Sequence, residues 1–374
     1  MRAIIALQKA DKNLKKRGMT MREKGHIIVA VLVALFLVFP KSVVFAAEKQ
    51  MTVAELALYK GADRQKILEE GARKEGKLTF YTTGILKQAV RPVVDSFNKK
   101  YPYIKVEIWR GGTGKLVPRV LEEYKSRKHD VDVIELTRAG SIIMIEKNII
   151  QPFYSPNQSS IEEYAIKKAP GGGVFTAGHY QSGAGVGYNT KLITKEELPK
   201  SYHDLLDPKW KSKMAIPGSS TGINWMGCIL VHFGESFLNQ LVKQDITVHM
   251  VSGRAILDMV INGEYMFSPT TFDSHVNKSK KEGAPIDWIP LEPVSCNLGQ
   301  VMLAKNSPHP HASLLFIDFD LTKESGEIYK AVGYNSPHKD VHSPRTYKKF
   351  FGSESTEQFV EWKKLFSKIL VKSK

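Results

Sequence analysis

Three strand-and-helix units follow one another between residues 78 and 145, and they constrain the fold more than any other feature. Strands are expected at residues 78–81, 105–109 and 131–136, and apolar residues recur at helical spacing after each of them. Strands that alternate with helices form a parallel sheet with right-handed crossovers. In such sheets, ligands bind beyond the carboxyl ends of the strands. The sequence therefore predicts an α/β protein with a site at that edge.

A glycine-rich extended stretch at residues 182–191 separates this segment from a second α/β segment. Glycine permits close backbone approach and unusual dihedral angles, and we interpret the stretch as a strand that leaves one lobe and enters another. The chain is expected to return through residues 290–299. The sequence thus predicts two lobes, each with a central, mostly parallel sheet flanked by helices and joined by two crossover strands. The expected bounds are residues 47–184 plus 298–374 for the first lobe and 185–297 for the second.

The N-terminal segment, residues 1–46, is expected to lie outside this fold. Basic residues precede an apolar run at residues 27–39, and Val44 and Ala46 stand at positions −3 and −1 of a cleavage site. This pattern is typical of a secretory signal peptide. We therefore expect export to the periplasm, with membrane anchoring as the alternative if the segment is not cleaved.

The formal net charge of +16 favours acidic partners or anionic ligands. Nucleic acid is not expected as a partner, because no basic run is combined with a stacking platform. Cys228 and Cys296 could form a disulfide in an exported protein or remain buried thiols, but two cysteines alone make no zinc framework. We expect a monomer without a cofactor or bound metal.

The stretch Arg110-Gly-Gly-Thr-Gly-Lys115 resembles a phosphate-binding loop but lacks the complete pattern. A glycine-rich loop before a helix still presents free N–H groups and the positive end of the helix dipole. Thr113 adds a hydroxyl group, and Arg110 adds a guanidinium group that can bind an anion through two hydrogen bonds. The alternative is a tight turn with a surface arginine.

Gly218-Ser-Ser-Thr-Gly222 matches the nucleophile-elbow pattern, between an expected strand and an expected helix. One hypothesis is a secreted serine hydrolase with Ser220 as the nucleophile. Its acid and base would come from the pairs Asp273 with His338 or Asp340 with His342. The other interpretation is that hydroxyl and N–H groups at this helix start hold an anion.

Several stretches together resemble the extracellular solute-binding proteins of bacterial ABC importers, in the ferric-iron-type branch with the type II periplasmic-binding fold. The resemblance covers residues 76–345. The stretches that carry it are Gly76-Lys-Leu-Thr-Phe-Tyr-Thr-Thr83, Arg110-Gly-Gly-Thr-Gly114, Asp130-Val-Asp-Val-Ile134, Ile149-Ile-Gln-Pro-Phe153, Gly187-Tyr-Asn-Thr190, the run from Leu198 to Trp210, and Lys213-Met-Ala-Ile-Pro217.

The resemblance implies a non-enzymatic protein that captures a small solute between two lobes and delivers it to an inner-membrane permease. Iron-binding members use a histidine after the first strand, a glutamate and two adjacent tyrosines. Here Thr82-Thr83-Gly84 and Ser268-Pro-Thr-Thr271 occupy the corresponding stretches, and no Tyr-Tyr pair occurs. We therefore expect an organic anion, with Fe(III) as the alternative. The expected binding residues are Thr82, Thr83, Arg110, Gly112, Thr113 and Arg138 in the first lobe, and Ser220, Thr221 and Thr271 in the second.

Overall fold

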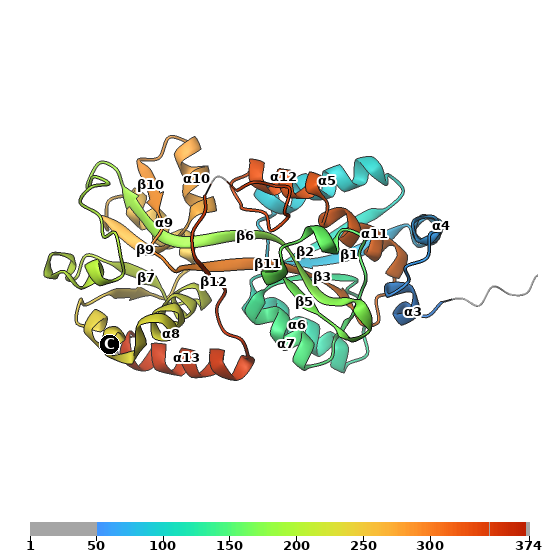
Figure 1. The fold of residues 1–374 in the computed structure, drawn as a ribbon, viewed down its shortest axis with the longest axis horizontal. Helices are drawn as coiled ribbons and strands as arrows, with labels where there is room; N and C mark the ends of the chain where they lie inside the picture. The colour runs from blue at the N-terminus through green and yellow to red at the C-terminus, as the bar shows by residue number, and fades with distance from the viewer. Residues whose placement is uncertain (1–50, 344, 372–374) are drawn as a thin grey trace, which may run out of the picture. The chain divides into compact units, whose positions relative to one another are not determined.

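The computed structural model describes residues 51–371 apart from residue 344, so the expected signal peptide lies outside the described residues. Among these residues, no helix combines the length and apolar character that a membrane span requires. Two lobes are built around a sheet that continues from one into the other (Figure 1).

The first lobe holds the three strand-and-helix units and the helices that cover them. β1 pairs in parallel with β2 on one side and with β3 on the other, which confirms the expected parallel arrangement. Its elements are α3 (Val53–Ala57), α4 (Arg64–Glu75), β1 (Lys77–Thr82), α5 (Arg91–Lys100), β2 (Lys105–Arg110), α6 (Thr113–Lys125), β3 (Val133–Thr137), α7 (Arg138–Glu146), β4 (Ile150–Gln151), β5 (Ile166–Lys168), α11 (Pro310–Asp320) and α12 (Lys323–Ala331).

The second lobe contains shorter strands and the long helix α8. Gly234, which has a positive φ of 78°, interrupts α8, and the helix continues beyond it to Val242. The elements of this lobe are β7 (Ala215–Pro217), α8 (Ser220–Val242), β8 (Thr247–His249), α9 (Gly253–Ile261), β9 (Phe267–Phe272), α10 (Asp273–Lys281), β10 (Ile286–Ile289) and α13 (Thr356–Ile369).

Two long antiparallel strands, β6 (Val174–Asn189) and β11 (Val294–Ala304), run through both lobes (Figure 1). In the first lobe, β11 pairs with β3, and in the second, β6 pairs with β9 and β10. The strand order is therefore β2-β1-β3-β11-β6-β10. These are the two crossover strands that the sequence predicted, although β6 begins before residue 182 and β11 begins after residue 290 and runs beyond residue 299.

The alternating glycines of β6 serve close packing. A Cβ atom on Gly183 would lie 2.5 Å from the Tyr347 hydroxyl oxygen, and one on Gly185 would lie 2.6 Å from the Ile289 carbonyl oxygen. Neither glycine has a positive φ. Glycine is therefore required at these positions for close packing and not for unusual dihedral angles.

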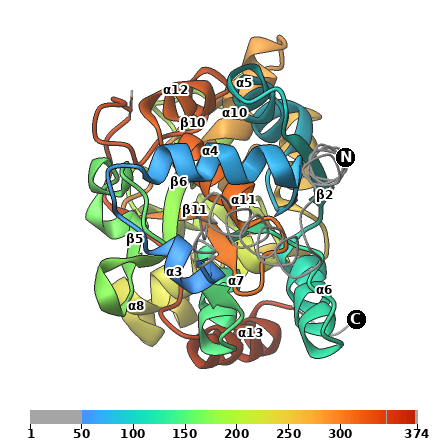
Figure 2. The ribbon, with the colours of Figure 1, turned by 90° about the vertical axis from the view of Figure 1, so that its right-hand side faces the viewer.

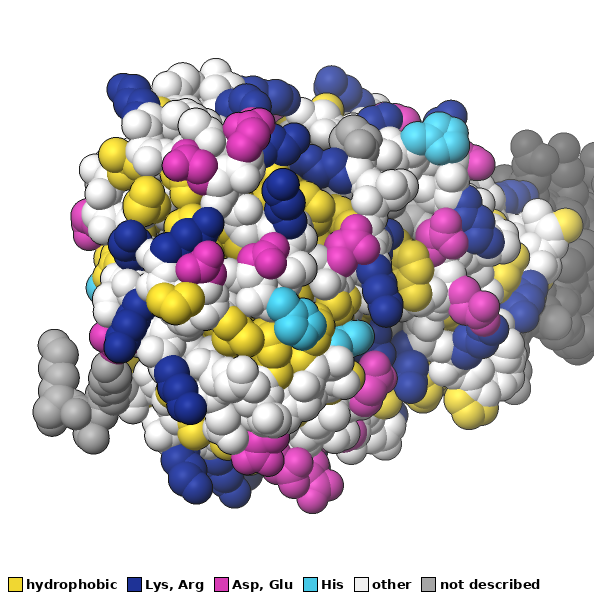
Figure 3. Space-filling model, turned by 60° about the vertical axis from the view of Figure 1, so that its left-hand side comes forward, with side chains coloured by type: hydrophobic (Ala, Val, Ile, Leu, Met, Phe, Trp, Pro, Cys, Tyr) yellow, Lys and Arg dark blue, Asp and Glu magenta, His cyan; other side chains and the backbone are white. Residues whose placement is uncertain are grey.

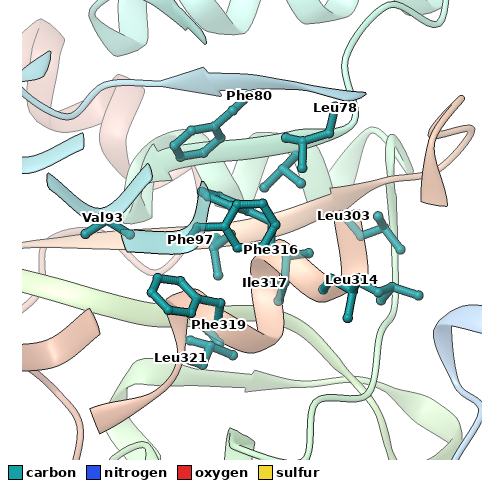
Figure 4. Packing of buried hydrophobic residues seen from close by; sticks show 14 of the residues in the cluster. Leu78, Phe80, Val93, Phe97, Leu303, Leu314, Phe316, Ile317, Phe319 and Leu321 are labelled. Atoms are coloured by element: carbon teal, nitrogen blue, oxygen red, sulfur yellow. The ribbon is translucent and has the colours of Figure 1, made fainter. Parts of the chain in front are cut away.

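Separate apolar cores stabilise the lobes. In the first, Phe97 of α5 packs against Phe316 of α11 with ring centroids 5.1 Å apart, and Phe80 of β1 lies 5.0 Å from the same ring (Figure 4). Helix α4 lies across α11 and adds Leu68 to this core (Figure 2). In the second lobe, Trp225 of α8 is fully buried within another cluster.

The last helix, α13, packs on the second lobe. Its buried residues Trp362 and Phe366 belong to the apolar cluster of α8, and Trp362 lies directly over Gly227. A short strand, β12 (Lys349–Phe350), pairs with the start of β11 on the way there. From the sequence, residues 298–374 were expected to belong to the first lobe. That assignment does not hold for α13, because its apolar face needs the surface of α8.

Both cysteines are buried free thiols, which decides between the two alternatives that the sequence left open. The Cys228 Sγ lies 3.3 Å from the Pro293 carbonyl oxygen, and the Cys296 Sγ lies 3.4 Å from that of Val294. On the face shown in Figure 3, Lys and Arg side chains are interspersed with Asp and Glu.

Candidate functional site

A cleft of about 400 Å³ lies where the carboxyl ends of the first-lobe strands face the second lobe. Both crossover strands contribute to its floor through Tyr180, Ser182, Asn297 and Gly299. The other lining residues are Thr83, Gly84, Ile85, Arg110, Gly112, Thr113, Thr137, Ser219, Ser220, Thr221, Ser252, Gly253, Arg254, Phe272, Ser274, His275 and Tyr334.

The register of the parallel strands brings the first-lobe residues together. Thr82 of β1 is paired with Arg110 of β2 and with Glu135 of β3, so the loops after these strands begin at the same level. Thr83, Arg110 and Thr137 therefore reach the cleft from three separate places in the sequence. This is the edge at which open α/β sheets bind ligands.

Five helices begin at the cleft. The residues that precede α6, α7, α8, α9 and α10 all line it, and they are Gly112, Thr137, Ser219, Ser252 and Phe272. Only Ser252 caps its own helix through its side chain, by accepting from the Ala255 N–H group at 3.3 Å. Helix N-termini carry partial positive charge and unsatisfied N–H groups. Together they favour an anion in the cleft.

The charged lining residues have the same sign. Arg110 is exposed and its side chain makes no hydrogen bond or ion pair with another described residue, whereas the Arg254 side chain is paired with Asp258 at 2.8 Å. No described aspartate or glutamate lines the cleft. Burial, followed by the nearby charge of Arg254, lowers the pKa of His275 to about 4, so this imidazole is neutral at pH 7.

Two buried carboxylates stand behind the cleft without lining it. Glu135 on β3 accepts hydrogen bonds from Thr83 and from the hydroxyl group of Tyr180, and it is fully buried. Asp273 at the start of α10 accepts from the Ser182 hydroxyl at 2.7 Å. Burial is the main reason why the pKa of Asp273 is raised. Both carboxylates fix the loops and hydroxyl groups that form the floor.

The structure brings together most of the binding residues expected from the sequence. Those that line the cleft are Thr83, Arg110, Gly112, Thr113, Ser220 and Thr221. Gly112 and Thr113 do so at the start of α6, as the glycine-rich loop predicted. The hydroxyl groups of Ser220 and Thr221 lie at the start of α8.

Three expected residues do not line the cleft. Thr82 is buried and donates to Glu135 at 2.6 Å. Arg138 lines another cavity and forms an ion pair with Glu354 at 2.6 Å. Thr271 lies within β9, which extends to Phe272, and its hydroxyl donates to the Gly185 carbonyl oxygen. Its position was wrong because a strand rather than a loop occupies that stretch.

Several residues that line the cleft were not predicted from the sequence. Tyr180 and Ser182 stand on β6 at the start of the recognised glycine-rich stretch, and the position of Ser252 before an apolar helical pattern predicts a helix cap. Ser252 was therefore a usable signal, because residues at helix N-termini next to the strand ends are favourable anion contacts. Arg254 and Tyr334 carry no local pattern that could have identified them.

The structure does not bring the proposed acid and base residues to Ser220, as the hydrolase hypothesis requires. Ser220 lines the cleft, but neither His338 nor His342 does. Asp273, the proposed acid of one pair, is buried and bonded to Ser182 and Asn335. The nucleophile-elbow match is thus explained by the ordinary start of α8.

The described residues contain no group of three or more His, Cys, Asp or Glu side chains suited to a metal ion. Two tyrosines that the sequence did not place, Tyr180 and Tyr334, line the cleft. Burial is the largest cause that raises the pKa of both phenols, and Glu135 adds to it. Fe(III) prefers anionic oxygen ligands, so its binding here would require these phenols to ionise.

Comparison with known proteins gives consistent results for family and fold. The model of the family described as Bacterial extracellular solute-binding protein matches residues 143–362. An uncharacterized protein of Haemophilus influenzae is 25% identical over 269 residues, which cover 69% of this chain and 76% of that protein.

Similar solved structures share the fold at low sequence identity. The periplasmic binding protein AfuA from Actinobacillus pleuropneumoniae, with fructose-6-phosphate bound, has a TM-score of 0.66 and 20% identity, covering 80% of this chain and 100% of that one. Iron-bound HitA from Pseudomonas aeruginosa has a TM-score of 0.65 and 18% identity, with 77% and 98% covered. The ferric binding protein from Campylobacter jejuni has a TM-score of 0.66 and 16% identity, with 78% and 99% covered.

Proposed function

Because this chain belongs to the bacterial extracellular solute-binding proteins, we propose that it captures a small organic anion in its interlobe cleft. The observation that carries this proposal is the convergence of five helix N-termini on a cleft whose charged lining residues are arginines. An anion there gains both the helix dipoles and charge-assisted hydrogen bonds.

Size and charge narrow the class of solute. A volume of about 400 Å³ falls at the lower end of the range of small-molecule pockets, roughly 300–1,000 Å³. Carboxylates, phosphonates, phosphate esters and sulfonates fit the donors that line it. A phosphate ester gains support from the fructose-6-phosphate bound in AfuA.

The proposed function also includes delivery of the bound solute to a membrane transporter. Closure of the two lobes on the anion removes water from the cleft, which strengthens the electrostatic contacts. The closed form then passes the solute to the permease of an ABC transporter in the inner membrane, and the protein acts as a periplasmic monomer. The expected signal segment at residues 1–46 supports the periplasmic location.

A thermal-shift screen of the protein starting at Ala47 tests the proposed ligand class. A ligand at 100 times its Kd stabilises the folded state by about 2.7 kcal/mol, which raises the Tm by several degrees. We expect a shift with at least one organic phosphate, phosphonate, sulfonate or carboxylate. A shift with no organic anion would contradict the proposal.

Fe(III) is the second candidate, because Tyr180 and Tyr334 line the cleft and iron-bound HitA has the same fold. Iron coordination would require ionised phenolates, and the visible absorption band of an Fe(III)-phenolate is a direct readout. Titration with ferric citrate should leave the visible spectrum unchanged if the cleft takes an organic anion. A new band that is lost in Tyr334→Phe would favour iron.

A further inference from the structure

A second cavity, of about 410 Å³, lies between α10 and the segment that follows α12. These two helices lie on the same side of β6 (Figure 1, Figure 2). Ser274 and His275 of α10 line the interlobe cleft. Asn277 and Lys281, further along the same helix, line the second cavity instead. Tyr334 is the only described residue that lines both, so the two cavities are distinct.

Four cationic side chains line this second cavity, and they come from three parts of the chain. They are Lys280 and Lys281 at the end of α10, Lys330 in the last turn of α12, and Arg345 in the segment that leads to β12. Among the described residues, Asp273 is the only carboxylate that lines the cavity. The lining therefore carries a formal excess of positive charge.

Two of the lysines have acidic partners that stand outside the cavity lining. Lys280 pairs with Asp287 at 2.8 Å, and Lys330 pairs with Glu327 at 3.3 Å. Both ion pairs are exposed to solvent, where such pairs contribute little to stability. These two ammonium groups can therefore turn to a ligand at small cost.

Lys281 and Arg345 keep donor capacity for a ligand. Lys281 donates to the Ala331 carbonyl oxygen at 3.4 Å, and no described carboxylate forms an ion pair with it. Arg345 donates from Nη2 to the Asn277 amide oxygen at 3.0 Å, while its buried Nη1 has no hydrogen-bond partner among the described residues. Oδ2 of Asp273 lies 3.8 Å from this Nη1, which is beyond hydrogen-bond distance. An unpaired buried donor is costly, so an acceptor supplied by a ligand would stabilise Arg345.

Asp273 is already occupied by other donors. Its Oδ1 accepts from the Ser182 hydroxyl and from the N–H groups of Gly183 and Ser274, at 2.7 to 3.1 Å. Its Oδ2 accepts from the Asn335 amide at 3.0 Å. A carboxylate offers about four lone-pair positions, so Asp273 has little capacity left for the cations around the cavity.

We propose that this second cavity binds a multivalent oxyanion, with two or more phosphate or carboxylate groups, through Lys281 and Arg345, with Lys280 and Lys330 at its rim. A guanidinium group binds such groups through paired hydrogen bonds, and ammonium groups bind them as point charges. The volume suits a small molecule, since such sites measure roughly 300–1,000 Å³. Because α10 belongs to the second lobe and α12 to the first, the bound anion contacts both lobes. The inference does not depend on which solute the interlobe cleft takes.

Isothermal titration calorimetry with pyrophosphate and with citrate, at constant ionic strength, tests this site. We expect the protein to bind at least one of the two probes. The tighter probe shows whether phosphate or carboxylate groups are preferred. Loss of one charge-assisted contact, in Lys281→Ala or in Arg345→Gln, should weaken that binding about tenfold.

Lys278→Ala is the matched control. Lys278 stands in the same last turn of α10 and pairs with Glu282, but it does not line the cavity. Its loss removes the same charge from the same helix end, so the affinity should stay within about twofold. Lys281 is exposed, so Lys281→Ala should fold even if Arg345→Gln, which removes a guanidinium group packed on the Trp288 ring, does not.

Arg110→Ala separates this site from the interlobe cleft, because Arg110 lines only the cleft. Binding at the second cavity should be unchanged in this variant. A loss of probe binding confined to Arg110→Ala would place the probe in the cleft and overturn the inference. Equal losses in Lys278→Ala and Lys281→Ala would also overturn it, since they would report only the general surface charge. Failure of both probes to bind would contradict it directly.

Discussion

Arg110 and Arg138 each stand at the end of a strand of the same parallel sheet, yet only Arg110 lines the cleft. The difference comes from Glu354, which lies far along the chain and pairs with Arg138 at 2.6 Å. Local sequence cannot reveal such a partner. The loops that follow strands could be predicted, and so could the anion-binding character of their residues. Which arginine remains free depends on tertiary contacts.

These two arginines form a natural pair of variants. Arg110→Ala should weaken binding of an organic anion about tenfold or more, because a charge-assisted hydrogen bond contributes about 1.5–3 kcal/mol. Arg138→Ala should leave the affinity within about twofold, since its ion pair is partly exposed and lies outside the cleft. Calorimetric titration of both variants with the anion that gives the largest thermal shift checks this. Similar losses in both variants would contradict the assignment.

His275, which lines the cleft, makes the stability of the folded protein depend on pH in the acidic range. Its pKa falls to about 4 in the folded protein, mainly through burial, whereas an unfolded histidine titrates near 6.5. The unfolded chain therefore binds more protons between these values, and the folded state loses stability as the pH drops from about 6.5 to 4.

Urea unfolding at pH 7 and at pH 4.5 measures this loss. The wild-type protein should lose more unfolding free energy on acidification than His275→Gln, whose amide does not titrate. Because all other titratable groups are common to both proteins, their contributions cancel in the comparison. Equal losses would show that His275 is protonated equally in the folded and unfolded states.

At the scale of elements, α13 shows what sequence periodicity can and cannot predict. The amphipathic pattern of residues 356–371 predicts a helix, and the helix forms at Thr356–Ile369. Its docking surface was not predictable, because a helix with one apolar face can cover any apolar surface that the chain lets it reach. Gly227 supplies the specific fit, since a Cβ atom there would lie 2.3 Å from the Trp362 ring. Similarly, the Ser268-Pro-Thr-Thr271 sequence of β9 is typical of a loop, although its backbone pairs with β6.

Trp362→Ala should destabilise the protein by about 3–5 kcal/mol, the usual cost of removing a buried aromatic side chain. Trp362 is 5% exposed and packs within the second-lobe core. Val360 on the same helix is 42% exposed, so Val360→Ala is a suitable control with an expected change below about 0.5 kcal/mol. Urea denaturation followed by circular dichroism gives both values. A small loss in Trp362→Ala would mean that α13 contributes little to the core.

At the scale of the whole described chain, the polypeptide passes between the lobes three times, through β6, β11 and the segment that contains β12. Two of these passages could be predicted from the sequence, and the third could not. Because β6 and β11 are also central strands of one sheet, separation of the lobes requires disruption of both cores.

We therefore expect the lobes to unfold in a single cooperative transition. Tryptophan fluorescence reports mainly on the second lobe, since Trp109 lies in the first and the other four, Trp210, Trp225, Trp288 and Trp362, lie in the second. Circular dichroism reports on both. Coincident urea curves from the two methods are the expected result. Separate midpoints would show that the lobes unfold independently.

The third passage also determines where the two ends of the described chain lie. Helix α3 packs against α11 in the first lobe, whereas α13 packs against α8 in the second. With an odd number of passages, the chain starts on one lobe and finishes on the other. Fluorescent dyes on α3 and α13 would therefore form an energy-transfer pair across the cleft, without any insertion into either core. Such a pair would make the protein an optical sensor of its own solute.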